Sequence, residues 1–88
     1  MSYEIKISKS ASKQIKKLSS EIQERIQVEI DSLAVEPRPD GVKKLKGRES
    51  GYRIRVGDYR IIYDIFDDIL LVTVVEVGHR SSIYKDKS

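Results

Sequence analysis

The chain has 88 residues, a formal net charge of +3, one histidine and no cysteine. This length suits a single domain with one modest core, and the composition excludes disulfides and makes zinc sites built from cysteine or histidine improbable. No apolar run approaches the roughly 20 residues that span a bilayer, and the polar start MSYEIKISKS does not resemble a signal peptide. We therefore expect one cytoplasmic domain over residues 1–88, with no membrane association and no metal.

The charges are segregated along the chain. Between Ser20 and Glu36, five acidic residues accompany one basic residue, whereas between Lys43 and Arg60 seven basic residues accompany two acidic ones. An ordinary surface would intersperse the two signs. The segregation predicts a positive field on one side of the domain, which suits a polyanionic partner.

The N-terminal third predicts a strand followed by two helices. Tyr3–Ile7 alternates between polar and apolar residues, as strands do. Ser8 or Ser10 can cap a short helix, and Ser20 with Gln23 fits a capping box that opens a second helix. The apolar positions of the two helices are Ala11, Ile15, Leu18, Ile22, Ile26, Ile30 and Leu33. Pro37 and Pro39 then end the second helix.

Three strands are predicted after a basic loop: 52–56, 59–66 and 69–77. Gly57-Asp58 and Asp67-Asp68 each leave two residues for a hairpin loop, and Gly57 suits a type II′ turn. The order β-α-α-β-β-β predicts an α+β domain, with a helical hairpin packed on one face of an antiparallel sheet. Residues 78–88 form a polar tail.

A two-residue loop at Gly57-Asp58 sets the register of the first hairpin. Val56 then faces Tyr59, and Arg55 faces Arg60. Because side chains alternate between faces, one face is apolar and available to the helices. It carries Tyr52, Ile54, Val56, Tyr59, Ile61, Tyr63 and Ile65. The other face carries Arg53, Arg55 and Arg60.

A two-residue loop at Asp67-Asp68 would pair Phe66 with Ile69 and Val75 with Arg60. Glu76 would then lie on the face packed against the helices. The chain beyond the last strand would pass the arginine end of the sheet, so that Arg80 and Tyr84 could join the same patch.

The patch of cations calls for an explanation, because like charges placed opposite each other destabilise a sheet. An absent anion explains their convergence, and phosphate is the leading candidate. The alternative is that the arginines point into solvent or pair with Asp58 and Asp64.

The segments GYRIRVGDYRIIYDI and VVEVGHRSSIY, preceded by KKLKG, resemble the C-terminal half of the RelE family within the RelE/ParE toxin superfamily. With the leading strand and helices, the resemblance extends over nearly the whole chain. It implies the fold of small microbial RNases and the toxin of a type II toxin–antitoxin system. It also implies an endoribonuclease that cuts mRNA in the ribosomal A site, inhibits translation and is neutralised by a RelB-like antitoxin.

The resemblance assigns roles to particular side chains. The residues that match the catalytic positions are Arg53, Arg55, Arg60, Arg80 and Tyr84. The residues expected to touch the RNA backbone are Lys43, Lys44, Lys46 and Arg48. Arginine stands at positions 53 and 55, where relatives often carry lysine. His79 has the titration range for proton transfer, although a structural role is the simpler interpretation. The 2′-hydroxyl of RNA would serve as the nucleophile, so neither a metal nor another cofactor is needed.

Two other functions remain open. A ParE-like toxin would share the fold but inhibit DNA gyrase instead of cutting RNA. A non-catalytic module would bind nucleic acid through the same arginines.

Overall fold

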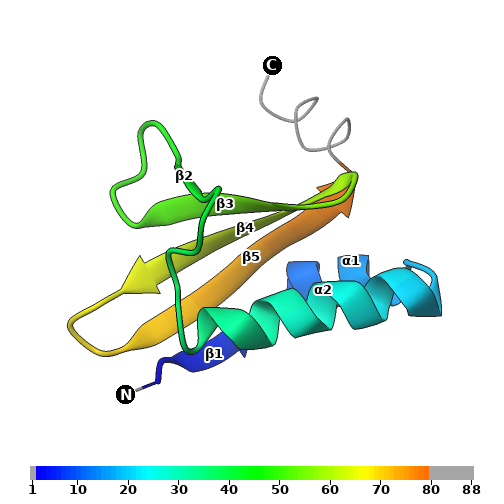
Figure 1. The fold of residues 1–88 in the computed structure, drawn as a ribbon, viewed down its shortest axis with the longest axis horizontal. Coiled ribbons are helices and arrows are strands. Elements are labelled where there is room, and N and C mark those ends of the chain that lie inside the picture. The colour runs from blue at the N-terminus through cyan, green and yellow to red at the C-terminus, as the bar shows by residue number, and fades with distance from the viewer. Residues whose placement is uncertain (1, 80–88) are drawn as a thin grey trace.

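Two helices cover one face of a five-stranded sheet in the computed structural model, which describes residues 2–79 (Figure 1). The elements are β1 (Glu4–Ile7), α1 (Lys9–Lys16), α2 (Ser20–Leu33), β2 (Lys43–Lys44), β3 (Gly51–Val56), β4 (Tyr59–Phe66) and β5 (Leu71–His79). The strand order is β1-β5-β4-β3-β2. The α+β fold and the helical hairpin are confirmed. No helix within residues 2–79 is both long and apolar enough to cross a bilayer.

The sheet has two features beyond the predicted antiparallel strands. β1 pairs with β5 in parallel, with Ile5 opposite Val72. The two-residue strand β2 adds a further edge beside β3, within the segment predicted as a basic loop. A strand this short carries too little alternation to be read from sequence.

Serine residues cap both helices. Ser8 is the N-cap of α1, and its Oγ accepts a hydrogen bond from the backbone N–H of Ala11 at 3.1 Å. Ser19 is the N-cap of α2, so the predicted start at Ser20 is the first helical residue. The predicted capping box is wrong, because Gln23 donates instead to the carbonyl of Leu18 at 2.8 Å. Gln23 thereby joins the start of α2 to the turn that follows α1.

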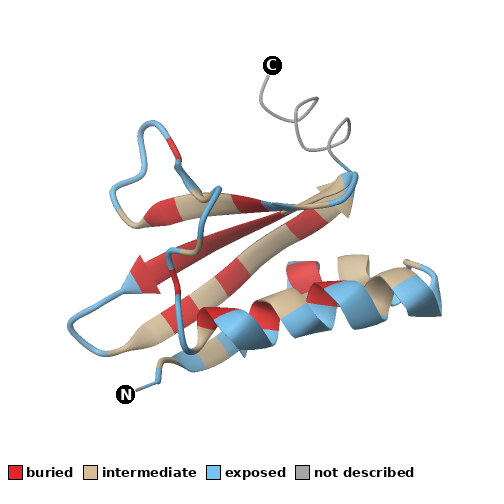
Figure 2. Cartoon of the chain, viewed as in Figure 1, coloured by how far each residue is buried: buried red, intermediate tan, exposed pale blue. Residues whose placement is uncertain are grey.

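The core lies between the helices and the sheet. Figure 2 shows that α2 is buried on the side facing the sheet and exposed on the other. The fully buried side chains include Ile26, Ile30, Leu33, Ile61, Tyr63, Val72, Val74 and Val77. Each such apolar side chain contributes about 1.5–3 kcal/mol by leaving water. This burial holds one face of β3, β4 and β5 against the helices and leaves their opposite face for the site.

The second hairpin differs from its predicted register. Phe66 pairs with Leu71, because the turn takes up residues 67–70 and Leu70 has a φ of 51°. A bulge between Ile62 and Tyr63 adds another offset, so that Ile62 faces Glu76 and Arg60 faces Gly78. The predicted pairing of Arg60 with Val75 is therefore wrong.

The bulge also moves Glu76 to the other face of the sheet. Glu76 is the cross-strand partner of Ile62, which packs with Leu45 on the face away from the helices. Its predicted place against the helices is thus wrong.

Candidate functional site

The β3–β4 hairpin has the register expected from its two-residue turn. Val56 pairs with Tyr59 and Arg55 with Arg60, and the pairing continues to Gly51 and Asp64. Gly57 has a φ of +60°, a conformation that costs a residue with a side chain about 1–2 kcal/mol. The glycine therefore sets the alternation that separates the apolar face from the basic one.

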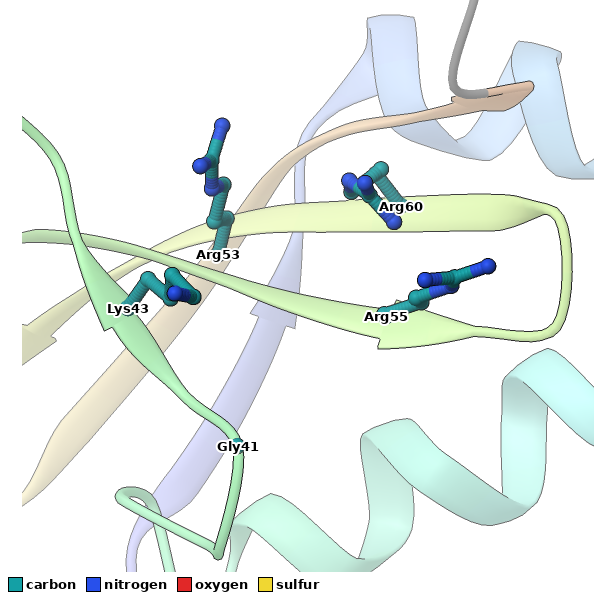
Figure 3. A pocket seen from close by; sticks show the side chains of 5 residues that line it. All are labelled: Gly41, Lys43, Arg53, Arg55 and Arg60. Carbon is teal, nitrogen blue, oxygen red and sulfur yellow. The ribbon is translucent and has the colours of Figure 1, made fainter.

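Three arginines and one lysine gather on the face away from the helices. Figure 3 shows the side chains of Arg53, Arg55 and Arg60 on one side of β3 and β4, with Lys43 beside them on β2. Together with Gly41 they line a pocket of about 140 Å³. We call this the arginine pocket. Its size and its charge suit a phosphate group.

The arginine pocket contains two cross-strand pairs of like charge. Arg55 lies opposite Arg60 across β3 and β4, and Lys43 lies opposite Arg53 across β2 and β3. Each such pair destabilises a sheet, on the order of 0.2–1 kcal/mol. The second pair was not anticipated, since the sequence placed Lys43 in a loop. A bound anion would offset the repulsion within these pairs.

The arginine side chains differ in how they are held. The Nε–H of Arg55 donates to the carbonyl of Gly57 at 2.9 Å, which turns its guanidinium toward the hairpin turn. Arg53 and Arg60 are half-buried, and the Nη1 of Arg60 is buried. Half-buried guanidinium groups on a rigid hairpin lose little freedom when an anion binds.

Arg48 does not join the arginine pocket. Its guanidinium lies 2.6 Å from both carboxylate oxygens of Asp64, which also accepts a hydrogen bond from Ser50 at 3.1 Å. Asp64, one of the acids considered as a partner for the site arginines, is thus engaged by Arg48. Leu45 packs against Ile62 nearby, so the loop that contains Leu45 and Arg48 covers the sheet at Ile62.

The other predicted RNA-binding lysines are exposed but lie outside the arginine pocket. Lys44 pairs with Tyr52, which packs against the helix-side core, so Lys44 and Lys43 lie on opposite faces. Lys46 is exposed in the loop after β2.

His79 ends β5 on the helix side of the sheet. It pairs with Tyr59, and the two rings meet edge to face with their centroids 5.5 Å apart. Arg60, the neighbour of Tyr59, points to the opposite face. The structure therefore does not bring His79 into the arginine pocket. Arg80 and Tyr84 lie outside the described residues.

A second polar cluster, which the sequence did not reveal, fastens the loop between α2 and β2. Arg38 binds Asp67 through two hydrogen bonds of 2.8 and 3.2 Å, and Tyr3 donates to the same carboxylate at 2.6 Å. These bonds lower the pKa of Asp67 to about 2. Arg38 also lies over the ring of Tyr52, 5.1 Å from its centroid. The cluster anchors the segment that leads to Gly41 and Lys43.

Burial and hydrogen bonding also fix Tyr63 at the base of this segment. Its hydroxyl donates to the carbonyl of Pro37 at 2.8 Å, and burial raises the pKa of the phenol. Arg38 is far from Asp67 in the sequence, and Pro37 is far from Tyr63. No local motif could have predicted these contacts.

The arginine pocket can bind and stabilise negative charge but offers no carboxylate or imidazole among the lining residues that lie within 2–79. Guanidinium hardly deprotonates, so its chemistry is electrostatic. Within residues 2–79, no group of three histidine, aspartate or glutamate side chains is arranged to hold a metal ion.

Comparison with known proteins identifies the family. Residues 5–84 match the model of the ParE toxin of type II toxin–antitoxin systems, parDE. The structure of an archaeal RelE–RelB complex from Pyrococcus horikoshii superposes with a TM-score of 0.81 and 32% identity, over 91% of this chain and 97% of that chain. This chain is a RelE family toxin.

Two further relatives of this RelE family toxin agree in length and fold. The mRNA interferase toxin RelE of Escherichia coli is 29% identical, over 98% of this chain and 94% of the relative. The RelBE2 toxin–antitoxin complex of Mycobacterium tuberculosis has a TM-score of 0.79 and 27% identity, over 90% of this chain and 99% of that chain. The toxin therefore spans nearly the whole length of its relatives.

Proposed function

We propose that this RelE family toxin is an endoribonuclease that cuts mRNA on the ribosome and so inhibits translation. The observation that carries the proposal is the arginine pocket, in which Arg55 lies opposite Arg60 and Lys43 lies opposite Arg53. An RNA phosphate would neutralise the repulsion within these pairs. The name of the Escherichia coli relative, an mRNA interferase, supports the same substrate.

The reaction uses the RNA as its own nucleophile. The 2′-oxygen attacks the adjacent phosphorus, the bond from phosphorus to the 5′-oxygen breaks, and the proton of the 2′-hydroxyl leaves while the 5′-oxygen gains one. The negative charge grows on the phosphoryl oxygens as the bonds change. Preorganised cations stabilise that charge, and terms of this kind are often the largest in catalysis. No metal is required by this scheme.

The side chains divide this task. Arg60 would bind the scissile phosphate, and Arg53 and Arg55 would bind phosphate oxygens and stabilise the 2′-alkoxide. From the family resemblance, Arg80 would join Arg60 and assist the leaving 5′-oxygen, and Tyr84 would stack on a base. Lys43 would contact the RNA backbone at the rim of the pocket.

Among the described residues that line the pocket there is no acid–base pair, which has a consequence for the substrate. Arginines alone supply little proton transfer, so correct alignment of the 2′-oxygen with the leaving oxygen must supply much of the rate. A ribosome that bends the mRNA in its A site would provide this alignment. Free mRNA would then be a poor substrate.

A RelB-like antitoxin is the proposed protein partner. The Pyrococcus horikoshii and Mycobacterium tuberculosis structures are toxin–antitoxin complexes. A basic pocket beside an exposed sheet face can accept an acidic amphipathic segment. Binding there would compete with RNA and suppress the activity.

Inhibition of DNA gyrase is the second candidate, because the matching family model is described as a ParE toxin. Two assays separate the candidates. Primer extension on mRNA, with and without ribosomes, detects cleavage, and the supercoiling of relaxed DNA by gyrase detects ParE-like inhibition. Ribosome-dependent cleavage with unaffected gyrase supports the proposal; gyrase inhibition without cleavage overturns it. A non-catalytic binding module would give neither effect.

A further inference from the structure

A second basic surface lies on α1, outside the arginine pocket. Residues 2–17 contain five lysines and one acidic residue. Within α1, Lys9, Lys13 and Lys16 are all exposed. At 100° per residue they fall within an arc of about 60° on the helix surface. We call these three residues the α1 lysine stripe.

The opposite side of α1 faces the core. Ala11 is fully buried, Ile15 packs against the core, and the side-chain oxygen of Gln14 accepts a hydrogen bond from the backbone N–H of Val77 at 2.7 Å. These contacts fix the rotation of the helix. The packing of the opposite side of α1 therefore keeps the lysine stripe on the solvent side of the helix.

Stability of the helix does not explain the whole stripe. Like charges three and four residues apart repel, each pair costing roughly 0.2–0.5 kcal/mol. Lys9 is the first residue of α1, where the helix dipole disfavours a cation, and the first turn contains no acidic residue. Lys13 and Lys16 lie in the last turn, where the dipole favours cations, so the dipole opposes the stripe at Lys9 alone. The ion pairs of Arg38 with Asp67 and of Arg48 with Asp64 do not involve the stripe.

The composition of the surface favours a polyanion over a protein. The exposed large apolar side chains of residues 2–79 are Ile7, Val28, Val35, Phe66 and Ile69. None of them belongs to α1, whereas protein interfaces usually have an apolar centre. Flexible lysines without apolar neighbours suit the sequence-independent neutralisation of nucleic-acid phosphates.

The stripe and the arginine pocket lie on opposite sides of the sheet. α1 lies on the same side of the sheet as α2 (Figure 1), packed on the face that carries Val74 and Val77. Arg53, Arg55 and Arg60 are on the other face. An RNA strand held in the pocket is thus separated from the stripe by the sheet and helix layers. A second RNA segment, on the opposite side of the domain, would be needed to meet the lysines.

We propose that the α1 lysine stripe is a second RNA-binding site, which contacts the phosphate backbone of folded ribosomal RNA while the arginine pocket holds the mRNA. The inference rests on the proposed action on ribosome-bound mRNA. In this arrangement the arginine pocket performs the cleavage. The stripe, on the opposite side of the sheet, adds binding affinity and orients the toxin on the ribosome. Both surfaces can bind RNA at the same time only where RNA lies on both sides of the protein.

The test compares the full chain with K9Q/K13Q/K16Q in binding to purified 70S ribosomes that carry a defined mRNA. Lysine and glutamine have similar helix propensities, so the helix should remain folded. We expect affinity about tenfold weaker at 0.15 M salt, and a plot of log affinity against log salt that is shallower by about 2. The rate of mRNA cleavage at saturating ribosomes should not change.

Two control variants isolate the site. K9R/K13R/K16R keeps the charge and should bind like the wild type. S20E/Q27E/V35E lowers the net charge by the same three units at exposed positions near or within α2 and should have little effect. An equal loss in this second control would show a general effect of net charge and overturn the proposal. Unchanged affinity and salt dependence in K9Q/K13Q/K16Q would do the same.

Failure of the nuclease proposal is distinguishable from failure of this one. If the wild type binds ribosomes through the stripe but cuts no mRNA, only the nuclease function fails. If the wild type cuts mRNA and the stripe variant binds equally well, only the stripe proposal fails. Weaker binding to the cognate antitoxin with unchanged ribosome binding would assign the stripe to a protein partner and contradict an RNA site.

Discussion

Arg55 lies directly opposite Arg60 in the β3–β4 hairpin, on the face of the sheet that the helices do not cover. One strand over, Lys43 lies opposite Arg53. The arginine pocket therefore contains two like-charge pairs at neighbouring positions, one across β3 and β4 and one across β2 and β3. This arrangement opposes folding and favours the binding of a phosphate.

Relief of that repulsion should stabilise the free protein. Arg55→Thr places a good strand former at an exposed position and removes one member of the pair. We expect the free energy of unfolding to rise by about 0.5 kcal/mol at low salt, measured by urea denaturation. The same variant should bind ribosome-bound mRNA more weakly. A loss of stability with unchanged RNA binding would assign Arg55 a purely structural role.

Gly57 should be required for both stability and activity. Gly57→Ala imposes a φ of +60° on a residue with a side chain, and we expect a loss of about 1 kcal/mol. Gly57→Asn is the matched control, because asparagine tolerates this region better. Urea denaturation of the three proteins should rank them glycine, asparagine, alanine. Equal stability of the alanine variant would contradict the turn geometry.

The register of the β3–β4 hairpin was predictable because Gly57 fixes a two-residue turn and the alternation of residues 52–65 is unambiguous. The helix stripe from Ile22 to Leu33 was predictable for a similar reason, since apolar residues recur at helical spacing. These local patterns were sufficient to place Arg53, Arg55 and Arg60 on one face.

The errors arose where local pattern gives no constraint. Asp67-Asp68 looked like a complete loop, yet the turn extends to Leu70, and Ile69 is 64% exposed instead of pairing with Phe66. The bulge beside Val75 leaves no trace in the alternation of apolar residues around it. The ion pair between Arg48 and Asp64 could not be predicted because the two residues are 16 positions apart, and the RNA-binding role of Arg48 stays a prediction.

Arg48 should be structural. Arg48→Ala would leave the buried carboxylate of Asp64 without its guanidinium partner, and we expect a loss of about 1–2 kcal/mol, reduced by the partial exposure of Arg48. R48A/D64N removes both charges and should recover part of this loss. Where R48A remains folded, its cleavage rate at saturating ribosomes should match the wild type. A large fall in that rate with unchanged stability would return Arg48 to the RNA site.

The bond between Arg38 and Asp67 should make stability depend on pH in a narrow acidic range. The folded-state pKa of Asp67, about 2, lies below its ordinary value of 3.8, so its contribution is complete above pH 4. It is lost as the pH falls from about 4 toward 2. The difference in unfolding free energy between the wild type and Asp67→Asn should therefore shrink below pH 4. A constant difference between pH 5 and pH 3 would contradict this account.

The most direct test of the arginine pocket is the single-turnover rate of mRNA cleavage on ribosomes for Arg60→Ala. Arg25→Ala is the matched control, because it removes one exposed arginine from α2, on the opposite side of the sheet. We predict a rate about 10²–10³-fold lower for Arg60→Ala at saturating ribosomes and an unchanged rate for Arg25→Ala. Cleavage by a folded Arg60→Ala protein at the wild-type rate would contradict the assignment of this pocket to the scissile phosphate.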